Sequence, residues 1–259
     1  MAPNRITLSE RPPRDLLSRI DRTAARMFKR KPAVLDLHRA VVSFTFDDVP
    51  HSAVRNGARI LSERGYRGTF YLCGGLCESE FGPWRFFSRN DVGRLFDGGH
   101  EIGCHTFAHP IMQGLGPPRL AAELDRNREW LGSLAGQADL TNFAYPYGAV
   151  GCFEKSRVAA RFDSCRGVRH GLNAGTIDLA QLAAVQLYDV QLDAAGLEAI
   201  IAQAVARRAW LLFYTHDVRG RPTWQGCSPE LLRRAIELAC DAGCQILPVR
   251  ETLALGLRP

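Results

Sequence analysis

From residue 41 onward, short apolar segments alternate with longer segments in which apolar residues recur at helical spacing. The segments predicted as strands are 41–48, 68–73, 100–106, 142–147, 163–168, 182–188, 210–216 and 245–249. The segments predicted as helices are 52–64, 89–98, 117–135, 152–161, 194–208 and 228–242. Alternating strands and helices form a parallel sheet covered by helices, either as a barrel or as an open doubly wound sheet. The sequence therefore predicts an α/β fold.

Polar side chains with reactive groups stand at the carboxyl ends of several predicted strands. Asp47 and Asp48 end the first strand, Tyr147 ends the fourth and His216 ends the seventh, and histidines flank the end of the third. A barrel collects residues from many strand ends on one face, whereas an open sheet concentrates its site at one switch point. The distribution therefore favours a barrel.

The composition is that of a folded protein. Of the 259 residues, 46% are hydrophobic and 23% are charged, which excludes disordered and fibrous chains. No segment has the length of uncharged apolar sequence that a membrane-spanning helix needs, and the N-terminus lacks the pattern of an export signal. We therefore expect a cytoplasmic protein whose eight cysteines are reduced thiols.

The net positive charge of the chain comes from its N-terminal segment. Residues 1–40 contain 10 basic and 4 acidic residues, and residues 41–259 contain 23 of each, so the net charge of +6 belongs to the first segment. A folded groove that binds nucleic acid needs basic residues on the body itself. We therefore expect no nucleic-acid partner, and we divide the chain into a basic N-terminal arm, 1–40, and a neutral domain, 41–259.

Apolar residues of the arm recur at helical spacing and have arginines and lysines around them. The apolar positions are Leu16, Leu17, Ile20, Ala24, Met27 and Phe28. This amphipathic basic helix has two interpretations. In the first, its apolar stripe packs against the domain. In the second, the helix lies on an anionic surface, either the inner face of a membrane or a lipid-phosphate substrate.

The strongest chemical pattern joins the adjacent carboxylates Asp47 and Asp48 to the pair His105 and His109. Two histidines four residues apart can offer ring nitrogens to one metal ion, and one carboxylate completes a set that leaves positions open for water and substrate. The other carboxylate would accept a proton from the attacking water. Taken separately, the aspartate pair and the histidine pair each have a simpler explanation. Adjacent aspartates often cap a helix, and two histidines four residues apart often lie on a surface.

Four segments, taken in order, resemble the signature motifs of one family. They are residues 45–50 (TFDDVP), 105–109 (HTFAH), 145–148 (YPYG) and 212–216 (LFYTH). Their order and spacing, over residues 41–250, are similar to those of the NodB-like polysaccharide deacetylases, carbohydrate esterase family four. The resemblance implies a distorted, incomplete (β/α) barrel and a divalent metal, commonly zinc, used to hydrolyse N-acetyl groups of amino sugars.

The resemblance also implies a role for each matched residue. Asp48, His105 and His109 correspond to the metal ligands, with zinc as the expected ion and cobalt, nickel or manganese as alternatives. Asp47 corresponds to the general base, and His216 corresponds to the acid that protonates the departing amine. The backbone N–H of Tyr147 is similar to the group that stabilises the oxyanion.

The sequence departs from the family pattern at three points. The third motif normally begins with an arginine that orients the base, and here that position is Ala144. We expect Arg166, at the end of the next predicted strand, to orient Asp47 instead by a charge-assisted hydrogen bond. The acidic pair and tryptophan of the fourth motif are not visible near residues 163–178. Val49 replaces the glycine that usually follows the two aspartates, which narrows backbone freedom there.

These observations predict a metal-dependent hydrolase that removes an N-acetyl group from an amino sugar of an oligosaccharide, a polysaccharide or a lipid-linked glycan. The alternatives are a deformylase or an O-acetyl esterase that acts on a lipid-linked sugar, and a carbohydrate-binding relative without turnover. Trp84 and Trp224, in the loops 74–88 and 218–228, are candidates for contacts with the sugar at the rim of the site. His100 is expected to be structural.

Overall fold

The computed structural model describes residues 11–135 and 140–257, so the first ten residues of the predicted arm lie outside the described residues. Its main sheet contains β2 (Val41–Asp47), β3 (Thr69–Leu72), β6 (Glu101–Cys104), β7 (Asn142–Ala144), β8 (Ser164–Arg166), β10 (Val185–Gln186), β11 (Trp210–Thr215) and β12 (Gln245–Ile246). The order is β10-β11-β2-β3-β6-β7-β8, with β12 also paired to β2, and every pair is parallel. Each strand lies within one of the eight predicted segments.

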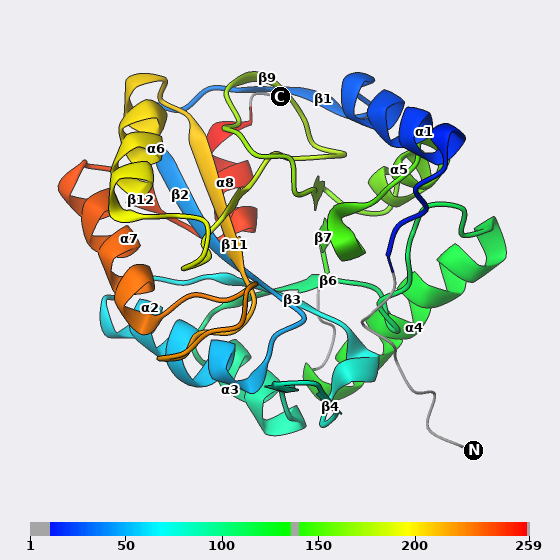
Figure 1. Ribbon diagram of the computed structural model, residues 1–259, viewed down its shortest axis with the longest axis horizontal. Helices are drawn as coiled ribbons and strands as arrows, with labels where there is room; N and C mark the ends of the chain where they lie inside the picture. The colour runs from blue at the N-terminus through cyan, green and yellow to red at the C-terminus, as the bar shows by residue number, and fades with distance from the viewer. Residues whose placement is uncertain (1–10, 136–139, 258–259) are drawn as a thin grey trace.

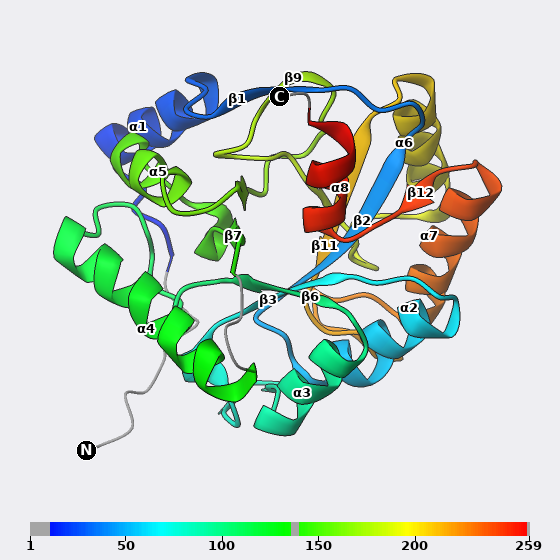
Figure 2. The ribbon, with the colours of Figure 1, turned by 180° about the vertical axis from the view of Figure 1, so that it is seen from behind.

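The sheet curls so that its two outer strands approach each other. Arg166 of β8 forms a parallel bridge with Leu182, three residues before β10 begins. Helices surround the curled sheet on its outer side, as Figure 1 and Figure 2 show from opposite directions. The predicted α/β fold, a distorted and incomplete (β/α) barrel, is therefore confirmed.

Helices connect the strands where the sequence predicts them. They are α2 (Arg59–Glu63), which continues a π-helical segment (Ala53–Ala58), α3 (Arg89–Asp97), α4 (Pro117–Ala135), α5 (Cys152–Ala159), α6 (Ala194–Ala206) and α7 (Pro229–Asp241). Ser88, Asp193 and Ser228 precede three of these helices, and each side chain accepts a hydrogen bond from a backbone N–H of the first turn. The sequence does not predict α8 (Val249–Gly256), which follows the last strand segment directly.

The centre of the sheet is buried and closely packed. Every residue of β2 is buried, as expected of a parallel strand that is covered on both faces. Phe46 of β2 stacks on Phe70 of β3 with 4.5 Å between ring centroids, and Phe44 stacks on Phe213 of β11 at 5.6 Å. The polar residues at the ends of these strands therefore project from a closely packed base.

Two small antiparallel pairs lie outside the main sheet and are not predicted from the sequence. β1 (Pro32–Leu35) pairs with β9 (Gly175–Asp178), and β4 (Glu80–Phe81) pairs with β5 (Trp84–Arg85). Segments this short do not show the alternation of apolar and polar residues that identifies a strand. The first pair attaches the N-terminal arm to the domain, and the second is a hairpin that carries Trp84.

α1 (Leu16–Met27) forms where the periodicity of the arm predicts a helix, but its packing differs from the expectation. Ala25 is buried, whereas Leu16, Leu17, Ile20, Met27 and Phe28 are between 54% and 78% exposed. The expectation that the apolar stripe packs against the domain is therefore wrong. Periodicity defines a stripe on a helix but does not specify which face the rest of the chain covers.

Two further expectations concern the membrane and the thiols. Among the described residues, none of the helices is both long enough and apolar enough to span a bilayer. All eight cysteines are free thiols in the structure, as expected.

Candidate active site

The polar strand ends converge on one cavity of about 220 Å³. Its lining includes Asp47, Asp48, Trp84, His105, His109, Tyr147, His216 and Trp224, which are all of the predicted site residues except Arg166. The carboxyl ends of β2, β6, β7 and β11 meet at one rim because these strands are parallel, and the residues that follow them therefore share one space. Arg166 lies directly behind Asp47.

The backbone around the cavity has an unusual conformation. Asp48, Val49, Thr106, His109 and Tyr147 have φ angles between 52° and 65°, in the left-handed region that residues with a Cβ atom rarely adopt. In the described parts of the chain, only two other non-glycine residues have a positive φ. Strained residues of this kind persist where the surrounding structure requires them, and they gather at functional sites.

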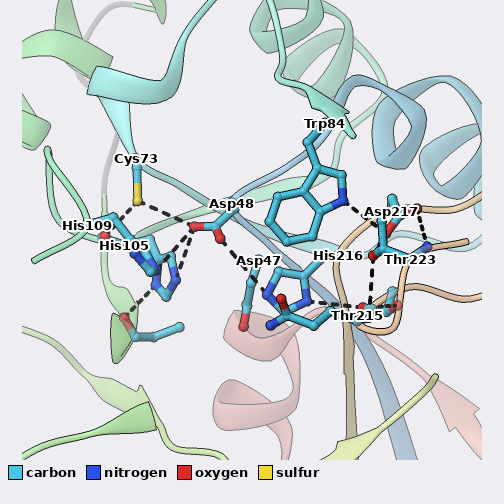
Figure 3. A network of polar contacts seen from close by, with 12 residues as sticks. Asp47, Asp48, Cys73, Trp84, His105, His109, Thr215, His216, Asp217 and Thr223 are labelled. Carbon is cyan, nitrogen blue, oxygen red and sulfur yellow. Dashed lines mark hydrogen bonds and ion pairs between the residues drawn. The ribbon is translucent and has the colours of Figure 1, made fainter. Parts of the chain in front are cut away.

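Asp48, His105 and His109 form a cluster of three buried ligand residues. Each offers one ligand atom, and these atoms all lie within 4.8 Å of one another. Nε2 of His109 lies 3.3 Å and Nε2 of His105 lies 3.6 Å from Oδ1 of Asp48, and Figure 3 shows both rings directed at this carboxylate. The thiol of Cys73 lies 3.8 Å from the same oxygen and donates to the backbone carbonyl of His105 at 2.9 Å.

The protonation of the two histidines suits a bound cation. Nδ1 of His105 lies 2.7 Å from the carbonyl oxygen of Ala144, which can only accept, so Nδ1 carries the proton and Nε2 presents a lone pair to Asp48. Burial lowers the pKa of His105 to about 4 and the pKa of His109 to about 3, which keeps both rings neutral near pH 7. A lone pair that faces a carboxylate oxygen repels it unless a proton or a metal ion lies between the two atoms, and burial raises the pKa of Asp48. The cluster therefore fits a divalent metal ion.

Asp47 is paired with Arg166. Nη2 of Arg166 donates to both carboxylate oxygens of Asp47 at 2.5 Å, and both side chains are buried. Burial, the largest single influence, raises the pKa of Asp47, but the Arg166 guanidinium and the nearby rings of His105 and His216 together hold the pKa below its ordinary value. The guanidinium also faces the rings of Tyr71 and Tyr214, at 5.3 and 4.9 Å. Arg166 of β8 thus lies against the carboxylate that it is expected to orient.

His216 is fixed by neighbours on several sides. Its Nδ1 lies 3.2 Å from the carbonyl oxygen of Gln225 and 3.4 Å from the hydroxyl of Tyr188. Its ring stacks on Trp84, with 5.8 Å between centroids and 2° between the ring planes. The Gln225 carbonyl can only accept, so Nδ1 carries a proton. The other ring nitrogen, Nε2, faces Asp48 and lies 4.0 Å from its Oδ2.

The two predicted tryptophans differ in how firmly they are held. Nε1 of Trp84 donates to Oδ1 of Asp217 at 3.2 Å, and the other oxygen of Asp217 accepts from the backbone N–H of Thr223 at 3.0 Å, a network visible in Figure 3. Trp84 is thus part of the cavity wall. Trp224 also lines the cavity but is 66% exposed, so it lies at the rim.

Three residues that support His216 or Trp84 are not predicted from the sequence. Tyr188 stands at the end of a predicted strand, as Tyr147 does, and this position could have identified it. Asp217 follows His216 directly, which is its only indication in the sequence. Gln225 acts through its backbone carbonyl, and no residue type identifies such a contact in advance.

Comparison with known proteins finds similar sequences. Residues 35–161 match the family model described as polysaccharide deacetylase. A chitooligosaccharide deacetylase of Azorhizobium caulinodans is 29% identical over 109 residues, which are 42% of this chain and 48% of that protein. The chain therefore matches about half the length of that relative.

Solved structures share the fold. A family 4 carbohydrate esterase of Bacillus subtilis superposes with a TM-score of 0.60 and 16% identity, over 90% of this chain and 88% of that one. A pseudoenzyme of the same family from Bacillus anthracis superposes with a TM-score of 0.57 and 17% identity, over 84% of this chain and 66% of that one. At these identities the likeness concerns the fold alone.

Proposed function

The resemblance to the NodB-like polysaccharide deacetylases is confirmed, and on this premise we propose that the chain is a metal-dependent hydrolase that removes an N-acetyl group from an amino sugar. One observation carries the proposal. A carboxylate paired with a buried arginine, a cluster of metal-binding residues and a fixed histidine share one cavity. The name of the Azorhizobium relative suggests a chitooligosaccharide as the first substrate to test.

Asp48, His105 and His109 would hold the metal ion, which we propose to be zinc, with cobalt, nickel or manganese as alternatives. When bound, a divalent ion polarises the carbonyl oxygen of an acyl group and lowers the pKa of a water molecule. The carbonyl of Ala144 holds His105 in the tautomer that leaves Nε2 available as a ligand.

The remaining residues would carry the proton transfers that an amide requires. Asp47 accepts the proton of the attacking water, and Arg166 keeps the Asp47 carboxylate ionised and oriented. As the acid, His216 carries a proton on both ring nitrogens, keeps the Nδ1 proton on the Gln225 carbonyl and donates the Nε2 proton to the amine nitrogen, which is a poor leaving group without it. The backbone N–H of Tyr147, at the wall of the cavity, stabilises the oxyanion.

Metal content of the purified protein is the first test, because it needs no substrate. We expect about one equivalent of a transition metal in the wild-type protein and loss of the metal in Asp48→Ala. Asp241→Ala, on the exposed surface of α7, is the control and should retain the metal. A wild-type protein that stays metal-free after incubation with zinc, cobalt, nickel and manganese would contradict the hydrolase and favour the carbohydrate-binding alternative.

Turnover is the second test. We expect the metal-loaded protein to release acetate from a chitooligosaccharide, and Asp47→Asn to reduce kcat by about a hundredfold or more, since a positioned general base contributes that much. Acetate release that is unchanged in Asp47→Asn would remove Asp47 from this role.

We further propose that Arg166 is a positioning residue for Asp47. Arg166→Met is expected to lower kcat by about a hundredfold with little change in KM, because the carboxylate loses its fixed orientation but the cavity keeps its shape. Arg166→Lys retains the charge but not the planar fork of donors, so it should recover part of the loss. Equal kcat values in wild-type and Arg166→Met proteins would refute the role.

The alternatives predict different products. A deformylase would release formate, and an O-acetyl esterase would release acetate from an oxygen ester but not from an N-acetyl sugar. The fold does not separate an enzyme from a binding protein, because similar folds include both a carbohydrate esterase and a pseudoenzyme. The buried pair of Asp47 and Arg166 favours an enzyme, since burying two charges is costly and a sugar-binding protein has no use for this pair.

A further inference from the structure

The apolar face of α1 points away from the domain although the helix is docked on it. Its exposed side chains are Leu16 (69%), Leu17 (78%), Ile20 (54%), Met27 (73%) and Phe28 (61%). These are five of the eleven large hydrophobic side chains that are exposed in the described parts of the chain. Four of them, together with Thr23 and Ala24, line a groove along the helix. Apolar side chains gathered in this way mark an interaction surface.

The opposite face of α1 is attached to the domain by hydrogen bonds. Nε2 of Gln113 donates to the carbonyl of Ser18 at 2.8 Å and to the carboxylate of Asp21 at 3.0 Å. The backbone N–H of Cys152 donates to the same carboxylate at 3.0 Å, and the buried amine of Lys155 donates to carbonyls at the end of the helix. Amphipathic helices of globular proteins normally turn their apolar stripe inward. Here specific polar contacts hold the stripe outward.

Exposed cationic side chains lie on α1 and next to its ends. They are Arg14, Arg19, Arg26 and Arg30, whereas the amine of Lys29 donates to the carbonyl of Thr176 in β9. Arg19 and Arg26 are seven residues apart and therefore project from the same side of the helix. The acidic residues of the segment 14–30 are Asp15 and Asp21, and both carboxylates accept hydrogen bonds from backbone N–H groups. The surface therefore combines an apolar strip with positive charge.

We propose that the exposed face of α1 binds the surface of an anionic lipid bilayer. The apolar side chains would enter the boundary between headgroups and acyl chains, while the arginines extend their charged ends to the lipid phosphates. A second copy of the chain is a poorer occupant, because a symmetric contact would bring the exposed arginines of the two copies together.

The position of α1 connects this surface to the cavity. Gln113 and Cys152, which hold α1, lie four residues after His109 and five residues after Tyr147, and Figure 1 shows α1 beside α5. A membrane-bound α1 would hold these loops close to the lipid headgroups, where the sugar of a lipid-linked substrate lies. This step, toward a lipid-linked amino sugar, rests on the proposed function, whereas the membrane binding itself does not.

Vesicle flotation of the purified chain tests the proposal. The vesicles contain phosphatidylcholine alone, or phosphatidylcholine with one third phosphatidylglycerol. We expect at least about tenfold tighter binding to the anionic vesicles and release at high salt. Leu17→Gln/Ile20→Gln should weaken this binding about tenfold or more, since two apolar side chains no longer enter the bilayer. Arg19→Gln/Arg26→Gln should weaken it about tenfold and reduce its dependence on salt.

Matched variants and a second assay separate the outcomes. Val190→Gln/Val205→Gln removes two exposed apolar side chains from other parts of the chain and should bind as the wild type does. The free energy of unfolding should be unchanged in Leu17→Gln/Ile20→Gln, because both side chains are exposed. Asp47→Asn, which tests the reaction, should also bind vesicles normally, so loss of turnover and loss of membrane binding are distinguishable.

Three results would overturn the proposal. The first is a wild-type protein that does not float with the anionic vesicles, and the second is a Leu17→Gln/Ile20→Gln variant that floats as well as the wild type. The third is a wild-type dimer, detected by analytical ultracentrifugation, that the same change dissociates, since this would assign the face to a second copy of the chain.

Discussion

Val49 is a buried β-branched residue that follows the two aspartates of the site with a φ of 52°. Its Cβ atom makes this conformation costly by about 1–2 kcal/mol. The hydrogen bond from the N–H of Phe87 to the carbonyl of Val49 at 3.2 Å helps to hold the turn in place. The backbone is therefore strained at the turn that follows Asp47 and Asp48, and both of these aspartates line the cavity.

We expect Val49→Gly to be more stable than Val49→Ala by about 1 kcal/mol, because glycine adopts the left-handed conformation without strain. Both variants lose nearly the whole buried side chain, so the comparison isolates the backbone. Urea unfolding of the two proteins measures the difference. At Val42, the second residue of β2, the order should be reversed, with alanine the more stable replacement. An alanine variant that equals or exceeds the glycine variant at position 49 would show that the turn is not strained.

His100 is a buried histidine with a structural role, and it makes stability depend on pH. The backbone N–H of Gly68 donates to its Nδ1 at 3.1 Å, and the hydroxyl of Ser62 lies 3.1 Å from its Nε2. Burial, and then the nearby charge of Arg67, lower the pKa of His100 from 6.5 to about 4. Between these two values the unfolded chain binds a proton that the folded chain does not bind, so stability falls as the pH falls.

We expect His100 to account for a loss of about 2 kcal/mol in the free energy of unfolding between pH 7 and pH 5. His100→Asn retains an acceptor for Gly68 but does not titrate in this range, so its loss over the same interval should be smaller by about that amount. Urea unfolding at the two pH values provides the comparison. Equal losses in the two proteins would mean that another group carries the pH dependence.

At the scale of the elements, Lys155 joins three parts of the chain. From α5, its buried amine donates to the carbonyl oxygens of Ala25 and Phe28 at the end of α1 and lies 2.6 Å from the carboxylate of Asp178 in β9. The same carboxylate accepts from the backbone N–H of Lys31, which leads into β1. This one amine therefore anchors the N-terminal arm to the domain.

Lys155→Met should destabilise the protein by about 3–5 kcal/mol, because it leaves the Asp178 carboxylate without its buried partner. The change should act locally first, so amide hydrogen exchange in α1 and β1 should accelerate more than exchange in β2. Arg157→Met, on the exposed side of α5, is the matched control and should leave exchange in α1 unchanged. Uniform acceleration across the protein would contradict a local anchor.

The elements also show which parts of the structure a sequence predicts. β2 and β11 are long, apolar and covered on both faces, so their sequence segments identify them, and Asp47, Asp48 and His216 are located by their place at the ends of these strands. Four-residue β1 has too few residues to show a period. The docked face of α1 was not predictable either, because it depends on Gln113 and Lys155, which lie far away in the sequence.

At the scale of the whole molecule, the proposed metal site exists only in the folded sheet. Asp48 follows β2, His105 and His109 follow β6, and β3 lies between these two strands. The two parts of the cluster are separated by more than fifty residues of sequence. An unfolded chain therefore offers no preformed site, and binding of a metal ion should stabilise the native state through mass action.

We expect a divalent ion at a hundred times its dissociation constant to add about 2.7 kcal/mol to the free energy of unfolding, which raises the Tm by about 5–10 °C. A chelator should reverse the shift, and Asp48→Ala should show none. Manganese and cobalt are better probes than zinc here, because the eight thiols released on unfolding bind zinc strongly and reduce the apparent stabilisation. A shift of equal size in Asp48→Ala would mean that the ion binds elsewhere on the folded chain, and the cluster at the end of β2 would lose its assignment.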